Sequence, residues 1–347
     1  MKVDTHRAVG RLSLGGAALL LAAGALAGCG GSTQSAAASG SSLPTVTLLL
    51  SYPSGWESPI WYGQEQGIFK KDGINLQISA PSGAEAASDI TFLSQAKYDA
   101  GYVGTYDLPV YHQKYGANVV NVFGWAQQNP ICWIVKDSSG ITKPQQLAGK
   151  PIAAPTSSAT NLIYSYFAHY GISKSKVNLE SVATDTMSSI FIAGKVAAVA
   201  GYAYAQLPEN ASHGNPSRAL CFSAAGQKYE ASGIAVNKSY LTSHRKAVAD
   251  LVKGLVDSFN TAKAHPLAAA KFMVSKFGKE VDPAPVDEQE TLAVFKLMST
   301  PNDKGHPYGW MSPQDMQQTV SYDQANYGLK PGYNISSFYT DEFFPKS

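Results

Sequence analysis

Arginine is scarce in this sequence. Four arginines occur among 347 residues, and two of them lie near the start, which leaves Arg218 and Arg245 for the rest of the chain. Sulfonates and phosphates are usually held by bidentate guanidinium groups, so the shortage disfavours a binding site of that kind. Basic and acidic residues nearly balance, at 27 and 25, which gives no electrostatic footprint for nucleic acid.

Cysteine and the common catalytic motifs are scarce as well. The chain has three cysteines, no CxxC, and no cluster of histidine and cysteine at metal-ligand spacing. It also has no GxSxG, no phosphate-binding P-loop and no GxGxxG. We therefore predict no metal site, no cofactor, no catalytic residue and no enzymatic activity.

The N-terminal region predicts an exported and anchored protein. Basic residues precede a short apolar run over 12–25, which is typical of a secretory signal rather than a membrane span. The run ends in Leu-Ala-Gly before Cys29, which is similar to the lipobox of bacterial lipoproteins. That resemblance implies removal of residues 1–28, lipidation of Cys29, and a location on the outer face of the bacterial cytoplasmic membrane; plain secretion is the alternative. Residues 29–43 are rich in Gly, Ser and Ala and predict a flexible tether.

If Cys29 carries lipid, Cys132 and Cys221 remain as an even pair in an oxidising compartment. They can form a disulfide, or they can be two buried free thiols in neighbouring strands.

From residue 44 on, short apolar strands alternate with helices, which predicts an α/β fold with mainly parallel sheets. About 300 residues exceed the usual size of one domain and predict two. The chain changes character near 125–130, where we place the crossing to the second domain. We expect a mostly helical tail to return to the first domain. The predicted division is 44–125 with 240–347 as domain 1, and 126–239 as domain 2.

The apolar patterns and the helix-start signals place individual elements. Strands are expected at 45–51, 74–78, 98–103, 131–136, 151–154, 196–200, 219–223 and 233–237. Helices are expected from Ser58-Pro59, over 84–96, 158–170 and 185–194, behind Ser243 through Ala247, Leu251, Leu255 and Phe259, and from Ser312-Pro313. A weak similarity between 92–109 and 191–208, with a one-residue slip, predicts two domains of similar build unless it arises by chance.

Four stretches of the chain resemble one protein superfamily. They are Pro53–Pro59 with Gly67–Ile74, Gly140–Ala154, Gly194–Ala198 and Tyr339–Phe344. In this order they are similar to the nitrate, sulfonate, taurine and thiamine-pyrimidine binding proteins of ABC importers, and they span nearly the whole chain after the tether.

The resemblance implies a two-lobed periplasmic-binding-protein fold of type II, with the ligand in the cleft between the lobes. It also implies a monomer whose partners are a small-molecule solute, an ABC permease and its ATPase. Two positions depart from the family pattern. Glu57 lies where relatives often have histidine, which argues against a pyrimidine-synthase enzyme, and Ala197 replaces the usual aspartate, which leaves the role of that carboxylate in doubt.

Ligands of open α/β sheets bind outside the carboxyl ends of the strands, so the candidate residues are those of the strand-to-helix loops. The loops offer aromatic faces, small hydroxyls at a helix start, and two carboxylates. The candidate ligand-binding residues are Trp56, Glu57, Trp61, Tyr62, Tyr106, Asp107, Thr156, Ser157, Ser158, Tyr202 and Tyr204.

Several of these candidates have a structural alternative. Trp61 and Tyr62 are neighbours on a short helix, so at least one is expected to pack in the core. Asp107 can be a helix N-cap, Ser157 and Ser158 can cap a helix, and Glu57 can be solvated.

An aromatic cleft with one or two carboxylates and no basic residue suits a neutral or weakly cationic ring compound, such as a thiamine pyrimidine precursor. Glu57 makes a ring nitrogen or an amine the first partner to test. A nitrate, sulfonate or carboxylate receptor of the same fold remains an alternative, as do a synthase-like enzyme and a sensory solute receptor.

Overall fold

The computed structural model describes residues 42–80, 86–155, 160–183 and 186–344. The predicted signal, the tether, Cys29, Thr156, Ser157 and Ser158 lie outside the described residues. Among the helices of the described chain, none is long and apolar enough to cross a membrane. Residues from Leu43 onward form one unit, and this unit contains two five-stranded sheets.

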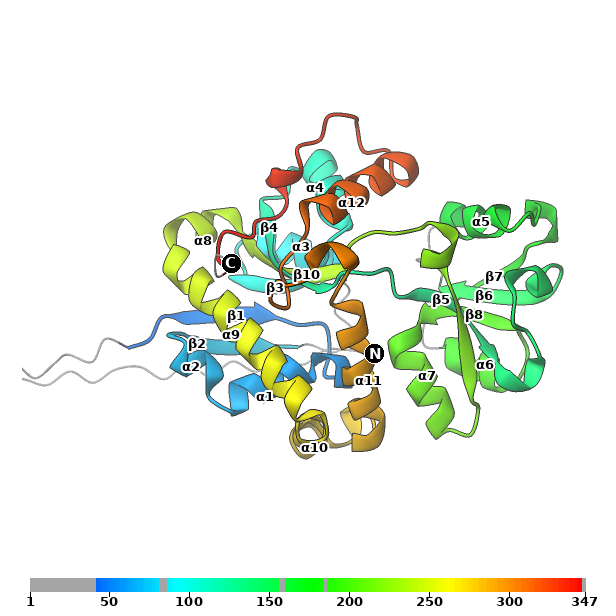
Figure 1. The fold of residues 1–347 in the computed structure, drawn as a ribbon, viewed down its shortest axis with the longest axis horizontal. Coiled ribbons are helices and arrows are strands. Elements are labelled where there is room, and N and C mark those ends of the chain that lie inside the picture. Colours follow the sequence, from blue (N-terminus) through cyan, green and yellow to red (C-terminus); the bar gives the residue numbers. More distant parts are fainter. Residues whose placement is uncertain (1–41, 81–85, 156–159, 184–185, 345–347) are drawn as a thin grey trace, which may run out of the picture. The chain divides into compact units, whose positions relative to one another are not determined.

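The first sheet combines strands from distant parts of the chain (Figure 1). Its order is β2-β1-β3-β10-β4, and only β10 runs antiparallel to its neighbours. The strands are β1 (Thr45–Leu49), β2 (Asn75–Ser79), β3 (Ala100–Gly104), β4 (Val119–Ala126) and β10 (Ser232–Asn237). The strand that we predicted over 233–237 therefore belongs to the first sheet, although the predicted division assigned it to domain 2. The hydrogen-bonded pairing of β10 with β3 and β4 decides this placement, and no local sequence pattern encodes such pairing.

The second sheet repeats the plan of the first, with the order β7-β6-β8-β5-β9 and only β5 antiparallel. The strands are β5 (Ile131–Lys136), β6 (Pro151–Pro155), β7 (Asn178–Val182), β8 (Ala198–Tyr202) and β9 (Ser217–Cys221). A disulfide joins Cys132 in β5 to Cys221 in β9. Both sheets are thus mixed, and each has one antiparallel strand in an otherwise parallel arrangement. In both sheets the antiparallel strand is the fourth in spatial order, but it comes last along the chain in the first sheet and first in the second.

Helices cover both faces of each sheet. They are α1 (Ser58–Glu65), α2 (Ile68–Lys71), α3 (Ala86–Ser94), α4 (Asp107–Tyr115), α5 (Thr160–His169), α6 (Met187–Ile192), α7 (Ala203–Ser212), α8 (Lys238–Ser243), α9 (Arg245–Ala264), α10 (Pro266–Phe277), α11 (Ala284–Leu297) and α12 (Pro313–Asn326). On the first sheet, α1, α9 and α10 share one core cluster, whereas α3, α4 and α12 share another. The helical tail therefore covers the first sheet, as predicted.

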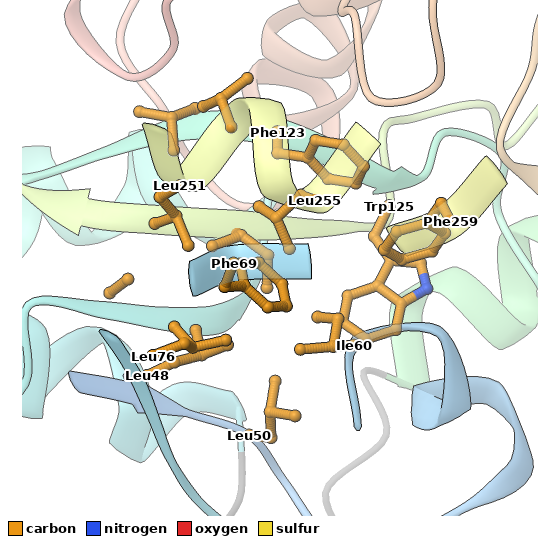
Figure 2. Close-up of a cluster of buried hydrophobic side chains, with 14 of the residues drawn as sticks. Leu48, Leu50, Ile60, Phe69, Leu76, Phe123, Trp125, Leu251, Leu255 and Phe259 are labelled. Atoms are coloured by element: carbon orange, nitrogen blue, oxygen red, sulfur yellow. The ribbon is translucent and has the colours of Figure 1, made fainter. Parts of the chain in front are cut away.

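The largest core lies under α9 (Figure 2). Its predicted apolar positions, every fourth residue from Ala247 to Phe259, are all buried. Leu251, Leu255 and Phe259 gather with Phe123 and with other labelled residues of β1, β2, β4, α1 and α2. The amphipathic period of 3.6 residues thus predicts this helix and its buried face.

The differences between predicted and observed elements have local causes. β4 is buried along its whole length, so it lacks the alternation of a half-buried strand, and the sequence analysis missed it. The long helix starts after His244 rather than Ser243, because the separate helix α8 ends at Ser243. Ser312 is the N-cap of α12, as predicted, and accepts a hydrogen bond from the backbone N–H of Gln314 at 3.2 Å.

Candidate functional site

The segment before α1 is bound tightly to α11. A 3-10 turn over Gly55–Glu57 brings the backbone so close that a Cβ added at Gly55 would lie 2.6 Å from the Cα of Asp287. The Thr291 hydroxyl donates to the carbonyl of Gly55 at 2.7 Å and lies 2.8 Å from the hydroxyl of Ser58. A turn rich in Pro, Gly and Ser is therefore held in place by a helix more than 200 residues further along the chain.

Glu57 stabilises this turn from inside the protein. Its side chain is fully buried and accepts hydrogen bonds from the backbone N–H and the hydroxyl of Ser51, at 3.1 and 2.8 Å. The indole N–H of Trp61 approaches the second carboxylate oxygen at 3.4 Å. Burial raises the pKa of Glu57 to about 8, against these hydrogen bonds, which lower it. Glu57 does not line the cavity described below.

Trp56 belongs to an aromatic cluster that connects the two sheets. Only 5% of the residue is exposed. Its ring centroid lies 5.1 Å from that of Tyr102 in β3 and 5.3 Å from that of Trp125 in β4. It also lies 6.0 Å from the ring of Tyr204 in α7, which follows the second sheet's β8. Trp56 thus packs against the rings of both Tyr102 and Tyr204.

Trp61 and Tyr62 pack against helix α10 instead. The ring of Trp61 packs 4.9 Å from Phe277, and the ring of Tyr62 packs 6.1 Å from Phe272, both on α10. Both candidates therefore pack against a neighbouring helix, as the sequence predicted for at least one of them. Neither lines the tyrosine cavity described below.

Five tyrosines line a cavity where strands of both sheets end. The cavity is small in this structure, with a volume of about 20 Å³, and no charged residue lines it. Its lining residues are Tyr102, Tyr106, Ala126, Pro130, Ile131, Tyr202, Tyr204, Tyr229, Ala231 and Ser232. Three of the predicted candidates, Tyr106, Tyr202 and Tyr204, therefore lie at one site. Two further lining residues were not predicted: Tyr102 lies inside a strand, and Tyr229 precedes β10 without a loop signal in the sequence.

The two connections between the sheets run past this cavity. Residues 127–130 lead from β4 to β5, and residues 222–231 lead back from β9 to β10. The Asn129 side chain donates to the carbonyl of Gln227 at 2.9 Å, and the N–H of Ala231 donates to the carbonyl of Ala126 at 2.8 Å. The predicted crossing at 125–130 coincides with the first connection.

Two aspartates lie near the tyrosines that line the cavity. Asp107 is the first residue of α4 and Tyr106 is its N-cap, so the N-cap alternative does not describe Asp107. Burial raises its pKa to about 7. Asp323 on α12 is fully buried, with no hydrogen-bond partner in the described chain; burial, and then the charge of Asp107, raise its pKa to about 9. Asp323 was missed because an acidic residue on an amphipathic helix usually faces solvent.

Both arginines of the described chain are engaged elsewhere. Arg218 pairs with Asp137 at 2.7 Å, and Arg245 pairs with Glu342 at 2.7 Å. Neither lines the tyrosine cavity. The described residues also contain no group of three or more His, Cys, Asp or Glu that could hold a metal ion.

A comparison with protein families finds one match that covers more than half of the chain. Residues 57–269 match the sequence model of the family described as NMT1/THI5 like. No curated protein matches the chain in sequence.

Solved structures share the fold at low sequence identity. The alkanesulfonate-binding protein SsuA of Xanthomonas axonopodis pv. citri, bound to MOPS, has a TM-score of 0.60 and 17% identity, covering 85% of this chain and 98% of its own. The periplasmic aliphatic sulphonate binding protein SsuA of Escherichia coli has a TM-score of 0.61 and 14% identity, covering 85% and 97%. A ligand binding component of an ABC-type import system from Staphylococcus aureus, with zinc bound, has a TM-score of 0.60 and 10% identity, covering 86% and 97%. These likenesses show the periplasmic-binding-protein fold that the sequence predicted.

Proposed function

Because the chain belongs to the NMT1/THI5-like family, we propose that it is a solute-binding protein that captures a small molecule for an ABC importer. In this proposal Cys29 carries a lipid, and residues 29–43 connect it to the binding unit on the outer face of the bacterial cytoplasmic membrane. The protein acts as a monomer, and its partners are the permease and the ATPase. Two of the structural neighbours are sulfonate-binding proteins and a third is an import-system component, which supports this role.

The tyrosine cavity is the observation that carries the proposal. It lies beside both connections between the sheets, where a hinge motion opens and closes a cleft. Tyr202 and Tyr204 stack with their ring planes 5° apart, and Tyr106 packs 4.8 Å from Tyr229. These flat faces suit an aromatic heterocycle, such as a thiamine pyrimidine precursor. Each aromatic pair contributes about 0.5–1.5 kcal/mol beyond burial, so micromolar binding, at about 8 kcal/mol, also requires burial of the apolar surface of the ligand.

The cavity lining favours a heterocycle over an inorganic anion or a sulfonate. It has no lysine and no arginine, whereas sulfonate recognition usually relies on such groups. Thr156, Ser157 and Ser158 remain proposed contacts, because they precede α5, whose start can offer free backbone N–H groups.

A thermal-shift and fluorescence titration tests the proposal. Heterocycles, alkanesulfonates and nitrate are added separately to the chain that lacks residues 1–28. A ligand that fills the cavity raises the melting temperature, and it changes tryptophan emission because Trp56 contacts Tyr102 and Tyr204. Tyr202→Ala, which removes a half-exposed lining ring, weakens the effect, whereas Tyr115→Ala, 71% exposed and outside the lining, does not. If no solute in the set shifts either signal, the receptor proposal is refuted for these classes.

A further inference from the structure

We propose that the first sheet carries a membrane-docking surface at the end opposite the tyrosine cavity, and that this surface binds the headgroup phosphates of an anionic bilayer. It consists of a groove with Lys238 and Lys330, and of the exposed ring of Tyr115 beside the groove. The inference rests on the lipid anchor of the proposed function, which keeps the protein next to a bilayer, and it assigns this surface no part in solute binding.

The groove opens between the end of α4 and residues 330–337. It has a volume of about 440 Å³, and its lining contains two lysines, Lys238 and Lys330, and no acidic residue. Neither ammonium group makes a hydrogen bond or an ion pair within the described residues; the lysines that do are others. Two positive charges thus lie at one hollow without a partner from the described chain.

Hydrogen bonds from α4 hold the loop that carries Lys330. The side-chain amide of Gln113 donates to the carbonyl of Gly328 at 3.1 Å, and its oxygen accepts from the backbone N–H of Lys330 at 2.7 Å. The loop is therefore tied to the helix on both sides of Leu329, which is itself buried. Lys330 extends from a fixed backbone.

His112 fixes the opposite wall of the groove. Its Nε2 donates to the carbonyl of Val119 at 2.7 Å, so its Nδ1 accepts from the hydroxyl of Tyr333, also at 2.7 Å. Burial, and then the charge of Lys238, lower the pKa of His112 to about 4, so the ring stays neutral at neutral pH. The charge of the groove therefore comes from its lysines.

The groove and the cavity lie at opposite ends of the β4–β10 pair. Lys238 follows Asn237, which pairs with Val119 at the start of β4. Ser232 and Ala126 pair at the other end and line the cavity. β4 has eight residues, and at about 3.3 Å per residue the two sites are about 25 Å apart. The groove is thus separate from the solute site.

The tether joins the chain at the same end of the sheet as the groove. β3 lies between β1 and β10, parallel to β1 and antiparallel to β10, so β1 starts at the end where β10 finishes. Residues 29–43 lead directly into β1. A flexible chain of this length has a root-mean-square span of about 20 Å. A lipid on Cys29 therefore holds the groove within reach of the bilayer.

Tyr115 adds an aromatic ring to this surface. It lies in the last turn of α4, next to Gly116 of the groove lining, and packs 5.1 Å from Tyr111. At 71% it is the most exposed large hydrophobic side chain of the described chain. Lys114, exposed in the same turn, adds a further positive charge. Tyrosine rings favour the headgroup level of a bilayer, and lysines near its surface are attracted by anionic lipids.

Docking through this surface turns the tyrosine cavity away from the bilayer, because the cavity lies at the other end of the first sheet. The solute site then stays open to solvent while the protein is attached. Each lysine near an anionic surface contributes about a fivefold gain in partitioning, so the attachment is weak and reversible. The protein can therefore leave the surface to reach the permease.

Co-sedimentation with vesicles tests the inference, with the chain that lacks residues 1–28 and carries no lipid. The vesicles are pure phosphatidylcholine or equal parts of phosphatidylcholine and phosphatidylglycerol. We expect binding to the anionic vesicles alone, and less of it at high salt. Lys238→Gln combined with Lys330→Gln should lower the partition coefficient by about 25-fold, and Tyr115→Ala should lower it severalfold.

The matched control removes two lysines elsewhere. Lys271→Gln combined with Lys279→Gln takes the same charge from exposed positions on α10 and in the turn after it, outside the groove lining. It should retain most of the vesicle binding. Both double variants should keep the melting temperature and the solute response of the unaltered chain, since the substituted side chains are not in the core.

The outcomes separate this inference from the receptor proposal. Equal binding to both kinds of vesicle, or an equal loss in the two double variants, overturns the docking surface and leaves the receptor function intact. Binding to polyglutamate but not to vesicles, or release from vesicles by inorganic phosphate at constant ionic strength, also overturns it, in favour of an acidic protein or a free anion. Vesicle binding that depends on Lys238 and Lys330, in a protein that binds no solute, supports the surface and counts against the receptor.

Discussion

Replacement of Glu290 by glutamine should remove most of a strong dependence of stability on pH. Glu290 lies on α11, where only 4% of it is exposed, and the backbone N–H of Gly55 donates to it. Burial, and then the charges of Asp287 and Asp282, raise its pKa to about 9. Glu209 adds to the repulsion from α7, which packs against α11 from the second sheet. The carboxyl group is therefore protonated in the folded protein at neutral pH.

The sign and size of the effect follow from this shift. The folded pKa lies above the unfolded value, so the stabilisation is complete below about pH 4.5 and is lost as the pH rises toward 9. One pKa unit corresponds to about 1.36 kcal/mol, so a shift from 4.5 to about 9 removes up to about 5 kcal/mol by pH 8. Glutamine keeps an acceptor for Gly55 and never ionises. Glu290→Gln should thus match the unaltered protein at pH 4.5 and exceed it by a few kcal/mol at pH 8.

Urea unfolding at pH 4.5, 6.5 and 8, followed by tryptophan fluorescence and circular dichroism, measures this difference. At about 2 °C per kcal/mol, the melting temperature at pH 8 should rise by up to roughly 10 °C. Glu288→Gln is the matched control, because it removes a carboxylate of the same helix that is not fully buried. If the stability of Glu290→Gln and of the unaltered protein changes in parallel with pH, the reasoning is refuted.

Two further substitutions test the packing that positions the site. Gly55→Ala should destabilise the protein by about 1–3 kcal/mol, because the new Cβ would meet backbone atoms of Asp287 at 2.6 and 2.7 Å; an unchanged urea midpoint would contradict this. Gly63→Ala gains about 0.5–1 kcal/mol of helix propensity but should still lower the midpoint, since its Cβ would lie 2.4 Å from the Cβ of Ser258 on α9. Ser258→Gly should restore part of the loss in the double variant, and additive losses in a double-mutant cycle would show that the contact is not the cause.

Much of the fold was predictable from local patterns. The stripe of α9, the Ser312 cap and strand β5 at 131–136 all appear where periodicity and capping place them. β4 was not predictable in this way, since burial on both faces removes the alternation that marks a strand. The sheet that holds β10 was also undetermined, because strand pairing depends on partners more than 100 residues away in the sequence.

The residues of the candidate site also differ in whether a local sequence pattern predicts them. Tyr106, Tyr202 and Tyr204 were proposed because aromatic residues that follow strand ends are typical of a ligand loop, and all three line one cavity. Trp61 and Tyr62, proposed by the same rule, pack against Phe277 and Phe272 of α10, because a one-residue step along a helix turns side chains toward other neighbours. Tyr229 and Asp323 carry no local signal, because only packing brings them beside Asp107.

Composition alone limits the chemistry that a site of this protein can offer, because the chain has many tyrosines and almost no arginine. Composition does not depend on the fold, so these limits on the ligand hold for any arrangement of the chain. The surroundings of each carboxylate, in contrast, depend on how the chain folds. Glu57 and Asp107 both follow strands in the sequence, yet Ser51 donates two hydrogen bonds to Glu57, whereas the carboxylate of Asp107 lies against Gly104. The free energy of a buried charge depends on its neighbours in space, and those neighbours come from strands and helices far apart along the chain.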